Sequence, residues 1–191
     1  MDRPTPPSKK ALRHQIRLLK DALTTLQREQ AATRLTSLAL SHPAITSTHT
    51  IISFWPMPDE INTAPLNISL ASHGHDLYLP LMVDNTLHFH LFQGTNTLSP
   101  DPLYGILQPP PDSPTLPHDI LSSGGANTVI ITPGMAFTPD GRRLGRGRGF
   151  YDRAFATLPN AIRIGVGFQC QLLDDLPTEP HDTSLHHIIL A

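Results

Sequence analysis

Apolar residues near the start of the chain recur with helical spacing. They step by four, three, four and three residues, and so share one helix face: Leu12, Ile16, Leu19, Leu23 and Leu26. This pattern predicts a helix from about Lys9 to Leu40, either continuous or broken once. Residues 1–7 contain three prolines, and we expect them to be disordered.

Beyond residue 40, short apolar runs alternate with helical patterns. We expect helices at Asn62–His73 and Tyr151–Leu158. The expected strands are Thr50–Trp55, Asp76–Leu79, Leu87–Phe92, Asn127–Thr132, Ile162–Phe168 and His186–Leu190. This alternation favours a single α/β domain over residues 8–191, with a largely parallel sheet covered by helices and a long N-terminal helix.

Seven prolines lie between residues 100 and 117, and they interrupt the pattern from Gly94 to Gly125. We expect an extended connection there, with one turn of helix near His118–Leu121. A connection of this length is unusual in a small domain. It either borders a binding site or crosses the surface.

Composition narrows the class of protein. The 191 residues are 39% hydrophobic and 16% charged, which is enough apolar material for a sizeable core. No apolar run approaches the roughly 20 residues of a membrane-spanning helix, and the polar N-terminus does not resemble a secretory signal. A single cysteine, Cys170, excludes an internal disulfide and is expected to be structural. We expect a cytoplasmic monomer without membrane or nucleic-acid partners.

Charge is unevenly distributed along the chain. All 14 Lys and Arg residues lie at or before Arg34, or at or after Arg142, and the eight acids between them give that middle segment a charge of −8. The two ends together carry +6. Basic segments far apart in sequence could therefore converge on one anionic ligand, although a simple scarcity of Lys would give the same pattern.

The most informative segment is residues 141–149, called the glycine-rich loop below, in which Gly and Arg alternate. Glycine lets the backbone approach a ligand, successive amides and a helix N-terminus can bind an anion, and arginine forks match phosphate oxygens. No Lys-Ser or Lys-Thr pair follows, so it is not a Walker A loop, and Phe150 stands where a dinucleotide fingerprint requires its third glycine. A flexible surface turn and an Arg-Gly RNA-binding segment remain alternatives.

Several other residues could carry chemistry. Asp152 could cap the helix after the loop or hold Mg²⁺, and Asp182 could be a second carboxylate or a turn residue. Glu60, next to Asp59, follows a predicted strand, where α/β proteins place ligand contacts, or could be an acid at a helix N-terminus. Trp55 could stack on a flat heterocycle or belong to the core. His88 and His90 share a strand face, but no third metal ligand is evident.

These segments together resemble the 5-formyltetrahydrofolate cyclo-ligase family over nearly the whole chain. The specific part is Gly141-Arg-Arg-Leu-Gly-Arg-Gly-Arg-Gly-Phe-Tyr-Asp-Arg153. The supporting parts are Lys9-Lys10-Ala-Leu-Arg13, Phe54 to Ile61, Leu79-Pro80, Gly105-Ile106, Pro133-Gly-Met-Ala-Phe137, Gln171, Leu176-Pro177 and His181-Asp182.

The resemblance implies a reaction that uses ATP and Mg²⁺. ATP would phosphorylate the formyl oxygen of 5-formyltetrahydrofolate, with or without a polyglutamate tail, and N10 would attack the activated carbon. Phosphate would leave to give 5,10-methenyltetrahydrofolate. Such chemistry requires mainly positioning and charge neutralisation.

The resemblance also implies roles for individual residues. Lys9 and Arg13 would meet the ATP phosphates, and Asp152 and Asp182 would hold Mg²⁺. The nucleotide would contact Arg143, Leu144, Gly145, Arg146, Gly147, Arg148, Gly149, Phe150 and Tyr151. The folate would contact Trp55, Glu60, Arg148, Gly149, Phe150 and Tyr151, with Arg148, Tyr151 and Glu60 as the catalytic set.

Four positions differ from residues common in the family: Thr138, Gln108, Arg148 and Phe150. Two other hypotheses follow from the same segments. One is a relative that binds folate and ATP but turns over slowly. The other is a non-catalytic module that binds RNA or another polyanion, whose affinity would fall steeply with salt.

Overall fold

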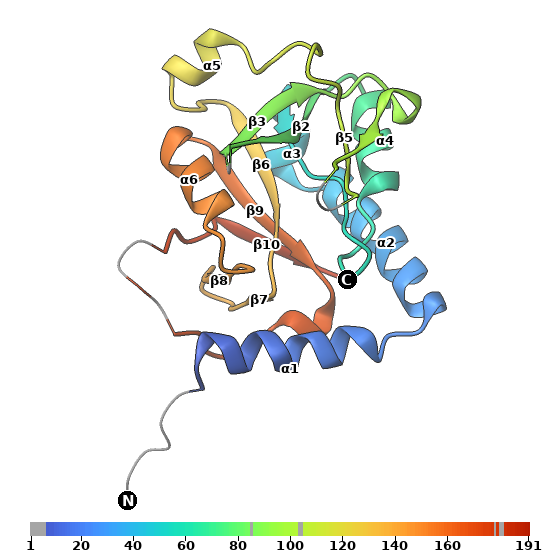
Figure 1. Ribbon diagram of the computed structural model, residues 1–191, viewed down its shortest axis with the longest axis vertical. Helices are drawn as coiled ribbons and strands as arrows, with labels where there is room; N and C mark the ends of the chain where they lie inside the picture. Colours follow the sequence, from blue (N-terminus) through green and yellow to red (C-terminus); the bar gives the residue numbers. More distant parts are fainter. Residues whose placement is uncertain (1–6, 85, 103–104, 178, 180–181) are drawn as a thin grey trace, which may run out of the picture.

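A six-stranded sheet forms the centre of the computed structural model (Figure 1). The structure describes residues 7–84, 86–102, 105–177, 179 and 182–191. The expected disorder of residues 1–7 falls almost entirely on residues 1–6, which lie outside that part. The strand order is β10-β9-β6-β1-β2-β3. The strands are β1 (Thr50–Ile52), β2 (Asp76–Val83), β3 (Thr86–Leu91), β6 (Thr128–Pro133), β9 (Ile162–Gly167) and β10 (His187–Leu190).

Five of these six strands run parallel, and the edge strand β3 pairs antiparallel with β2. The expectation of a largely parallel α/β sheet is therefore confirmed. The predicted strand Thr50–Trp55 is too long, because β1 ends at Ile52. The carbonyl of Phe54 instead accepts hydrogen bonds from the side chains of Thr63 and Asn67, which turn the chain toward the next helix.

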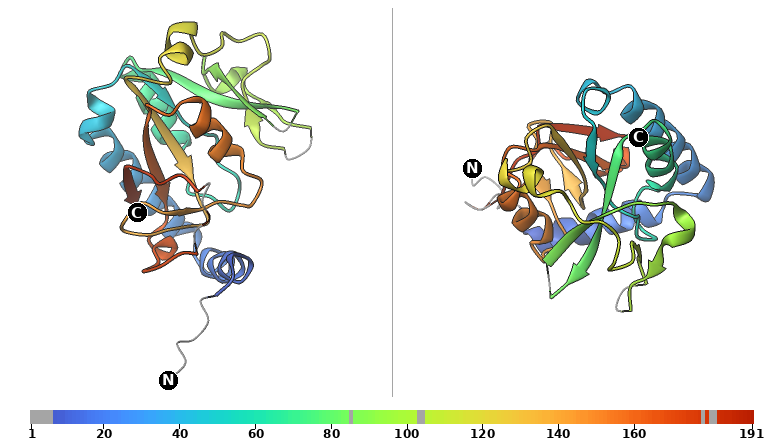
Figure 2. Two further views of the ribbon diagram at one scale, coloured as in Figure 1. Left: turned by 90° about the vertical axis from the view of Figure 1, so that its left-hand side faces the viewer. Right: turned by 90° about the horizontal axis from the view of Figure 1, so that it is seen from above.

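Helices cover both faces of the sheet (Figures 1 and 2). Alternate strand residues point to opposite faces. Ile51 packs with α2 (Thr25–Leu40), α3 (Pro43–Thr46) and α4 (Ala64–Ser72). The neighbouring Ile52 packs instead against α6 (Phe150–Thr157). These two apolar clusters form the core.

The N-terminal helical region is broken once. α1 (Lys9–Asp21) is followed by α2, which starts at a capping box formed by Thr24 and Gln27. The predicted single apolar face is wrong beyond Ile16, because Leu19 and Leu26 are exposed and Lys20 is fully buried. The break redirects the chain, so the face of α1 does not continue into α2.

α1 lies across one end of the sheet and packs on a small hairpin (Figure 1). The hairpin joins β7 (Ala136–Phe137) to β8 (Arg143–Leu144), and no pattern in the sequence predicted it. Leu12 and Ile16 of α1 pack against Met135, Ala136 and Leu144. This packing brings the N-terminal basic residues to the glycine-rich loop.

The proline-rich connection contains little regular structure, as expected. It holds η1 (Thr95–Thr97) and a two-residue ladder between β4 (Ser99–Pro100) and β5 (Leu107–Gln108). α5 (His118–Ser122) confirms the predicted helical turn. A further short helix, η2 (Gln169–Gln171), follows β9. Among the described residues, none of these helices is long and apolar enough to cross a membrane.

Candidate active site

A cavity of about 760 Å³ opens beside the carboxyl ends of β1 and β6. Parallel α/β sheets commonly bind ligands at this edge. The structure places every predicted site residue on the wall of this one cavity: Lys9, Arg13, Trp55, Glu60, Arg143, Leu144, Gly145, Arg146, Gly147, Arg148, Gly149, Phe150, Tyr151, Asp152 and Asp182. The fold brings these residues together from the two chain ends and the acidic middle. Their individual roles remain predictions.

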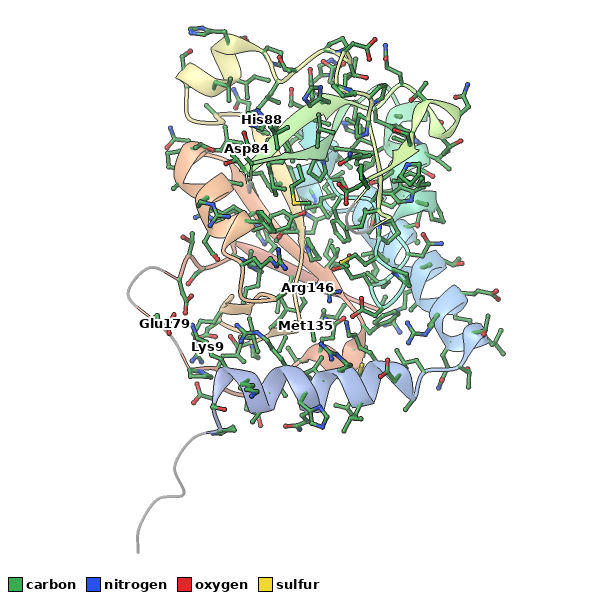
Figure 3. The ribbon with its side chains drawn as sticks, in the orientation of Figure 1. Lys9, Asp84, His88, Met135, Arg146 and Glu179 are labelled. Atoms are coloured by element: carbon green, nitrogen blue, oxygen red, sulfur yellow. The ribbon has the colours of Figure 1, made fainter. Side chains whose placement is uncertain are left out.

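α1 contributes two cations to the cavity. The Lys9 ammonium lies 2.8 Å from Asp182 Oδ2. It also lies 3.1 Å from Glu179 Oε2, and Figure 3 shows these two residues near the start of α1. Burial lowers the pKa of Lys9, but these hydrogen bonds outweigh it, and the net pKa is raised. Arg13 Nε donates to the carbonyl of Gly145 at 2.8 Å. The N-terminal part of α1 therefore contacts both the glycine-rich loop and the segment before β10.

The glycine-rich loop needs glycine for steric reasons at two positions. Gly141 has φ +87°, and a Cβ there would lie 2.4 Å from the carbonyl oxygen of Leu185. Gly149 has φ +66° and is the N-cap of α6. Glycine provides no side-chain acceptor for the first amides of this helix, which stay suited to an anion. The loop backbone thus supports the predicted anion site.

Arg143 and Asp152 form an ion pair on the cavity wall. Arg143 Nη2 donates to Asp152 Oδ1 at 2.9 Å, and the Arg143 side chain is only 5% exposed. Its guanidinium also lies over the rings of Tyr151 and Phe155, at 5.6 and 5.5 Å. This packing indicates that Arg143 orients the side chains of Asp152 and Tyr151 through direct contact.

Tyr151 keeps its proton at neutral pH. Burial, together with the charge of Glu60, raises the pKa of its hydroxyl well above the usual range, although Arg143 opposes the shift. The hydroxyl is therefore a hydrogen-bond donor to whatever occupies the cavity. Trp55 also lines the cavity; its ring centre is 6.2 Å from that of Phe92, and it is only partly buried. A planar ligand could stack there.

Two acids and two cations form a chain of ion pairs that reaches the cavity wall at Arg146 and Glu60. Lys20 Nζ lies 2.7 Å from Asp59 Oδ2, and Arg146 Nη2 lies 2.5 Å from Asp59 Oδ1 and 3.1 Å from Glu60 Oε1. Glu60 Oε2 accepts from the backbone N–H of Met57 at 3.0 Å. Burial by itself would raise the pKa of Asp59, but hydrogen bonds from Lys20 and Arg146 lower it from 3.8 to about 2.

Reasoning from the sequence missed Lys20 and gave Asp59 no role of its own. The signal for Lys20 was its position four residues after Ile16, which continues the line of buried positions Leu12 and Ile16. A lysine on an apolar face is buried only when it finds a partner. That partner, Asp59, is 39 residues away, so no local pattern could reveal it.

The proline-rich connection borders the cavity. Asp101, Ile106, Leu107 and Gln108 line it, and Gln108 is one of the positions that differ from common family residues. A second cavity of about 400 Å³ lies next to the first and shares Trp55 and Glu60 with it. Thr138, another differing position, is buried, and its hydroxyl accepts a hydrogen bond from the backbone N–H of Arg142.

Asp152 and Asp182 are the candidate metal ligands. Both carboxylates line the same cavity, and each is already bonded to a cation, Arg143 or Lys9. In the part of the chain that the structure describes, no three His, Cys, Asp or Glu residues cluster closely enough to hold a metal alone. Two carboxylates suit Mg²⁺ when phosphate oxygens complete its coordination. Pro180 and His181 lie outside the described residues.

In the described part of the chain, His88 and His90 belong to no group of three or more metal-ligating residues. His90 is buried, and its Nδ1 lies 2.9 Å from the carbonyl oxygen of Ser113. This hydrogen bond gives Nδ1 a partner within the protein. Cys170 is half-buried, and burial raises the pKa of its thiol, in agreement with a structural role.

The fold and the cavity define the chain as an α/β protein with a cavity at the carboxyl edge of its parallel sheet. Residues 5–191 match the model of the 5-formyltetrahydrofolate cyclo-ligase family. The 5-formyltetrahydrofolate cyclo-ligase of Haemophilus influenzae is 33% identical over 187 residues, which cover 94% of this chain and 96% of that protein. The Escherichia coli K12 enzyme of the same name is 30% identical, with 91% and 95% covered. The chain belongs to the 5-formyltetrahydrofolate cyclo-ligase family.

Solved structures agree on the fold. The NMR structure of Aquifex aeolicus 5,10-methenyltetrahydrofolate synthetase superposes with a TM-score of 0.80 at 22% identity, and covers 95% of this chain and 89% of that one. A 5,10-methenyltetrahydrofolate synthetase from Mycoplasma pneumoniae gives 0.72 at 21% identity, with 96% and 98% covered. The resemblance and the expectation of an enzyme of this family are therefore confirmed.

Proposed function

We propose that this chain catalyses the ATP-dependent cyclisation of 5-formyltetrahydrofolate to 5,10-methenyltetrahydrofolate, with ADP and phosphate as the other products. One observation carries the proposal beyond family membership. A single cavity gathers the arginines of the glycine-rich loop, suited to phosphates, and Trp55 with Glu60, suited to a polar heterocycle. Two substrates of these kinds could therefore react within one space.

The reaction needs the formyl oxygen to leave, which a formamide does poorly. Transfer of the ATP γ-phosphoryl group to that oxygen breaks the bond to ADP and makes a good leaving group. N10 then adds to the formyl carbon, the C–N bond forms and N10 loses its proton. Breaking of the C–O bond releases phosphate and leaves the methenyl bridge. The enzyme's contribution to such chemistry is positioning and neutralisation of charge.

The residues of the phosphate side carry the charge. We assign Lys9 and Arg13 to the ATP phosphates, together with the backbone amides of residues 145–150. Arg148 would face the transferring phosphoryl group, where a guanidinium fork matches its equatorial oxygens. Tyr151 would donate a hydrogen bond to the same oxygens, because a tyrosine hydroxyl is protonated at neutral pH and the raised pKa of Tyr151 favours that form further.

The folate side has fewer charged groups. Glu60 is held by Met57 and Arg146, so its carboxylate is oriented before any ligand arrives. We assign it to the N–H groups of the pterin or to the formyl end. Trp55 would stack on the substrate's ring system, and Phe150 would add an apolar contact. The segment 106–108 would close this side of the cavity.

Asp152 and Asp182 fit Mg²⁺ because they are oxygen donors on the wall that we assign to the phosphates. When bound, the ion would neutralise phosphate charge. Arg143 holds Asp152 in place for this role at 2.9 Å. Lys9 lies beside Asp182, so the same pair of groups could receive both the metal and a phosphate oxygen.

We further propose that the chain acts as a cytoplasmic monomer and accepts folates with or without a polyglutamate tail. Nucleic acid is not among the proposed partners. Two arginines of the glycine-rich loop are occupied by carboxylates, Arg143 by Asp152 and Arg146 by Asp59 and Glu60. This arrangement differs from the open, low-complexity tails that bind RNA through Arg-Gly repeats.

An absorbance assay tests the function. Purified protein should convert 5-formyltetrahydrofolate to the methenyl chromophore only when ATP and Mg²⁺ are both present. Omission of either one serves as the control. No absorbance change with folded protein would refute the proposal, and salt-dependent RNA binding in its place would favour the polyanion-binding alternative.

A further inference from the structure

Lys20 is the one described lysine whose side chain is completely buried. It does not line the 760 Å³ cavity, yet its ammonium lies 2.7 Å from Asp59 Oδ2 and 4.0 Å from Met135 Sδ. Burial of an ammonium group costs free energy unless a partner of opposite charge lies beside it. The carboxylate of Asp59 must therefore stay close to Lys20. The partner here stands next to Glu60, a proposed substrate contact.

Asp59 uses its two oxygens for two different cations. Oδ2 meets Lys20 of α1, and Oδ1 meets Arg146 of the glycine-rich loop. Arg146 in turn contacts Glu60 Oε1 with both Nε and Nη2, at 3.2 and 3.1 Å. The order of contacts therefore runs Lys20, Asp59, Arg146, Glu60. It connects α1, the glycine-rich loop and the acid of the folate side.

We propose that Lys20 is a positioning residue: through Asp59 it holds Arg146, and so fixes the glycine-rich loop and Glu60 relative to each other before substrates bind. This inference rests on the proposed function for its effect on turnover, but its structural part does not. The loop has a second attachment, from Arg13 to the Gly145 carbonyl, so loss of Lys20 should loosen the loop without unfolding the domain.

Replacement of the lysine tests the proposal in the ligand-free protein. In Lys20→Met the apolar stem remains and the charge is removed. The backbone N–H groups of Met57 and Glu60 donate to Glu60 Oε2 and to the Met57 carbonyl, so their hydrogen exchange reports how firmly Glu60 is held. Their exchange should become about tenfold faster, as expected when a cooperative contact is lost. Exchange in β6 and β9 should stay as in the wild type. Lys10→Met, on the exposed part of the same helix, is the matched control and should change neither region.

A second variant covers the case in which Lys20→Met fails to fold. Lys20→Met/Asp59→Asn removes both charges, so no carboxylate is left buried beside a missing partner. Arg146 then retains Glu60 alone, and the Met57 and Glu60 amides should again exchange about tenfold faster. Wild-type exchange at the Met57 and Glu60 amides of either folded variant would overturn the proposal. So would equal acceleration throughout the domain, because that indicates only general destabilisation.

Binding of ATP without folate gives a second readout. Calorimetry should show affinity about tenfold weaker in Lys20→Met than in the wild type. Because Lys20 acts through Arg146, Lys20→Met/Arg146→Ala should bind no more weakly than Arg146→Ala alone. Additive losses would overturn the proposed route. If the wild type itself binds no ATP, the proposed function fails, while hydrogen exchange still decides the structural role of Lys20.

Discussion

Lys9 Nζ lies 2.8 Å from Asp182 Oδ2, although 173 residues separate them in the sequence. The pair joins the first helix to the segment before the last strand, and both residues line the cavity that holds the glycine-rich loop. The chain ends that carry the surplus of basic residues therefore meet at one place. This convergence is what the uneven charge distribution allowed but could not establish.

Removal of the Lys9 charge should weaken ATP binding. In Lys9→Met we expect KM for ATP to rise about tenfold, because a charge-assisted contact to phosphate is lost, while KM for the folate changes little. Steady-state kinetics with each substrate varied in turn measure both constants. Lys10→Met, exposed and absent from the cavity wall, should behave as the wild type. An equal rise in both KM values would argue against a role confined to phosphate.

Arg148 and Asp152 should matter for turnover more than for folding. Each change to Ala should lower kcat by about a hundredfold, the scale seen when one group that stabilises transition-state charge is removed. Arg148→Lys should keep part of the activity, because an ammonium retains the charge without the fork. Arg34→Ala, exposed on α2, is the control. Near-native rates in both Ala variants would remove these residues from the catalytic set.

Much of the fold was predictable because the strands and helices have strong local periodicity. The parallel sheet and the turn at His118–Leu121 followed from apolar spacing and proline positions, whereas a break between Lys9 and Leu40 was only one of two possibilities. The antiparallel edge strand β3 was not distinguished from the others, since the residues of a strand do not record its direction. The β7–β8 hairpin was missed because each of its strands has only two residues.

The residues of the candidate site were predictable from the sequence, but the ion pairs and hydrogen bonds between their side chains were not. The glycine-rich loop is contiguous, so its residue types alone indicate an anion site. The partners of its arginines come from distant segments, Asp59 and Glu60 for Arg146. Lys20 is the clearest example of what the sequence could not predict. A lysine in a helix normally indicates a solvent-exposed position, and only the tertiary fold brings Asp59 to within 2.7 Å of this one.

The Asp59 ion pairs should stabilise the protein in a pH-dependent way. The pKa of Asp59 is lowered to about 2, so its stabilisation is fully present above the unfolded value of 3.8 and is lost as pH falls through about 2. A lowering of this size corresponds to about 2 kcal/mol. Asp59→Asn should therefore be less stable than the wild type by about that amount near pH 6.

Urea unfolding of both proteins at several pH values measures the difference. It should stay constant from pH 7 to about pH 4.5 and shrink below pH 4, because protonation makes wild-type Asp59 resemble the amide. Asp140→Asn, whose carboxylate is exposed, is a comparison in which a smaller effect is expected. A difference that stays unchanged down to pH 3 would contradict the assignment of the pKa.

The steric role of Gly141 can be separated from its backbone conformation. Gly141 and Gly74 both have φ +87°, but a Cβ at Gly74 meets nothing within 4 Å, whereas one at Gly141 would lie 2.4 Å from the Leu185 carbonyl oxygen. Gly74→Ala should therefore cost only the left-handed strain of about 1 kcal/mol. The Leu185 N–H also donates to the Gly141 carbonyl at 2.7 Å, so these two segments of the chain cannot separate freely. Gly141→Ala should therefore cost about 2 kcal/mol more than Gly74→Ala. Equal unfolding free energies for the two variants in urea would show that the loop yields without resistance, and that the turn does not depend on close contact with Leu185.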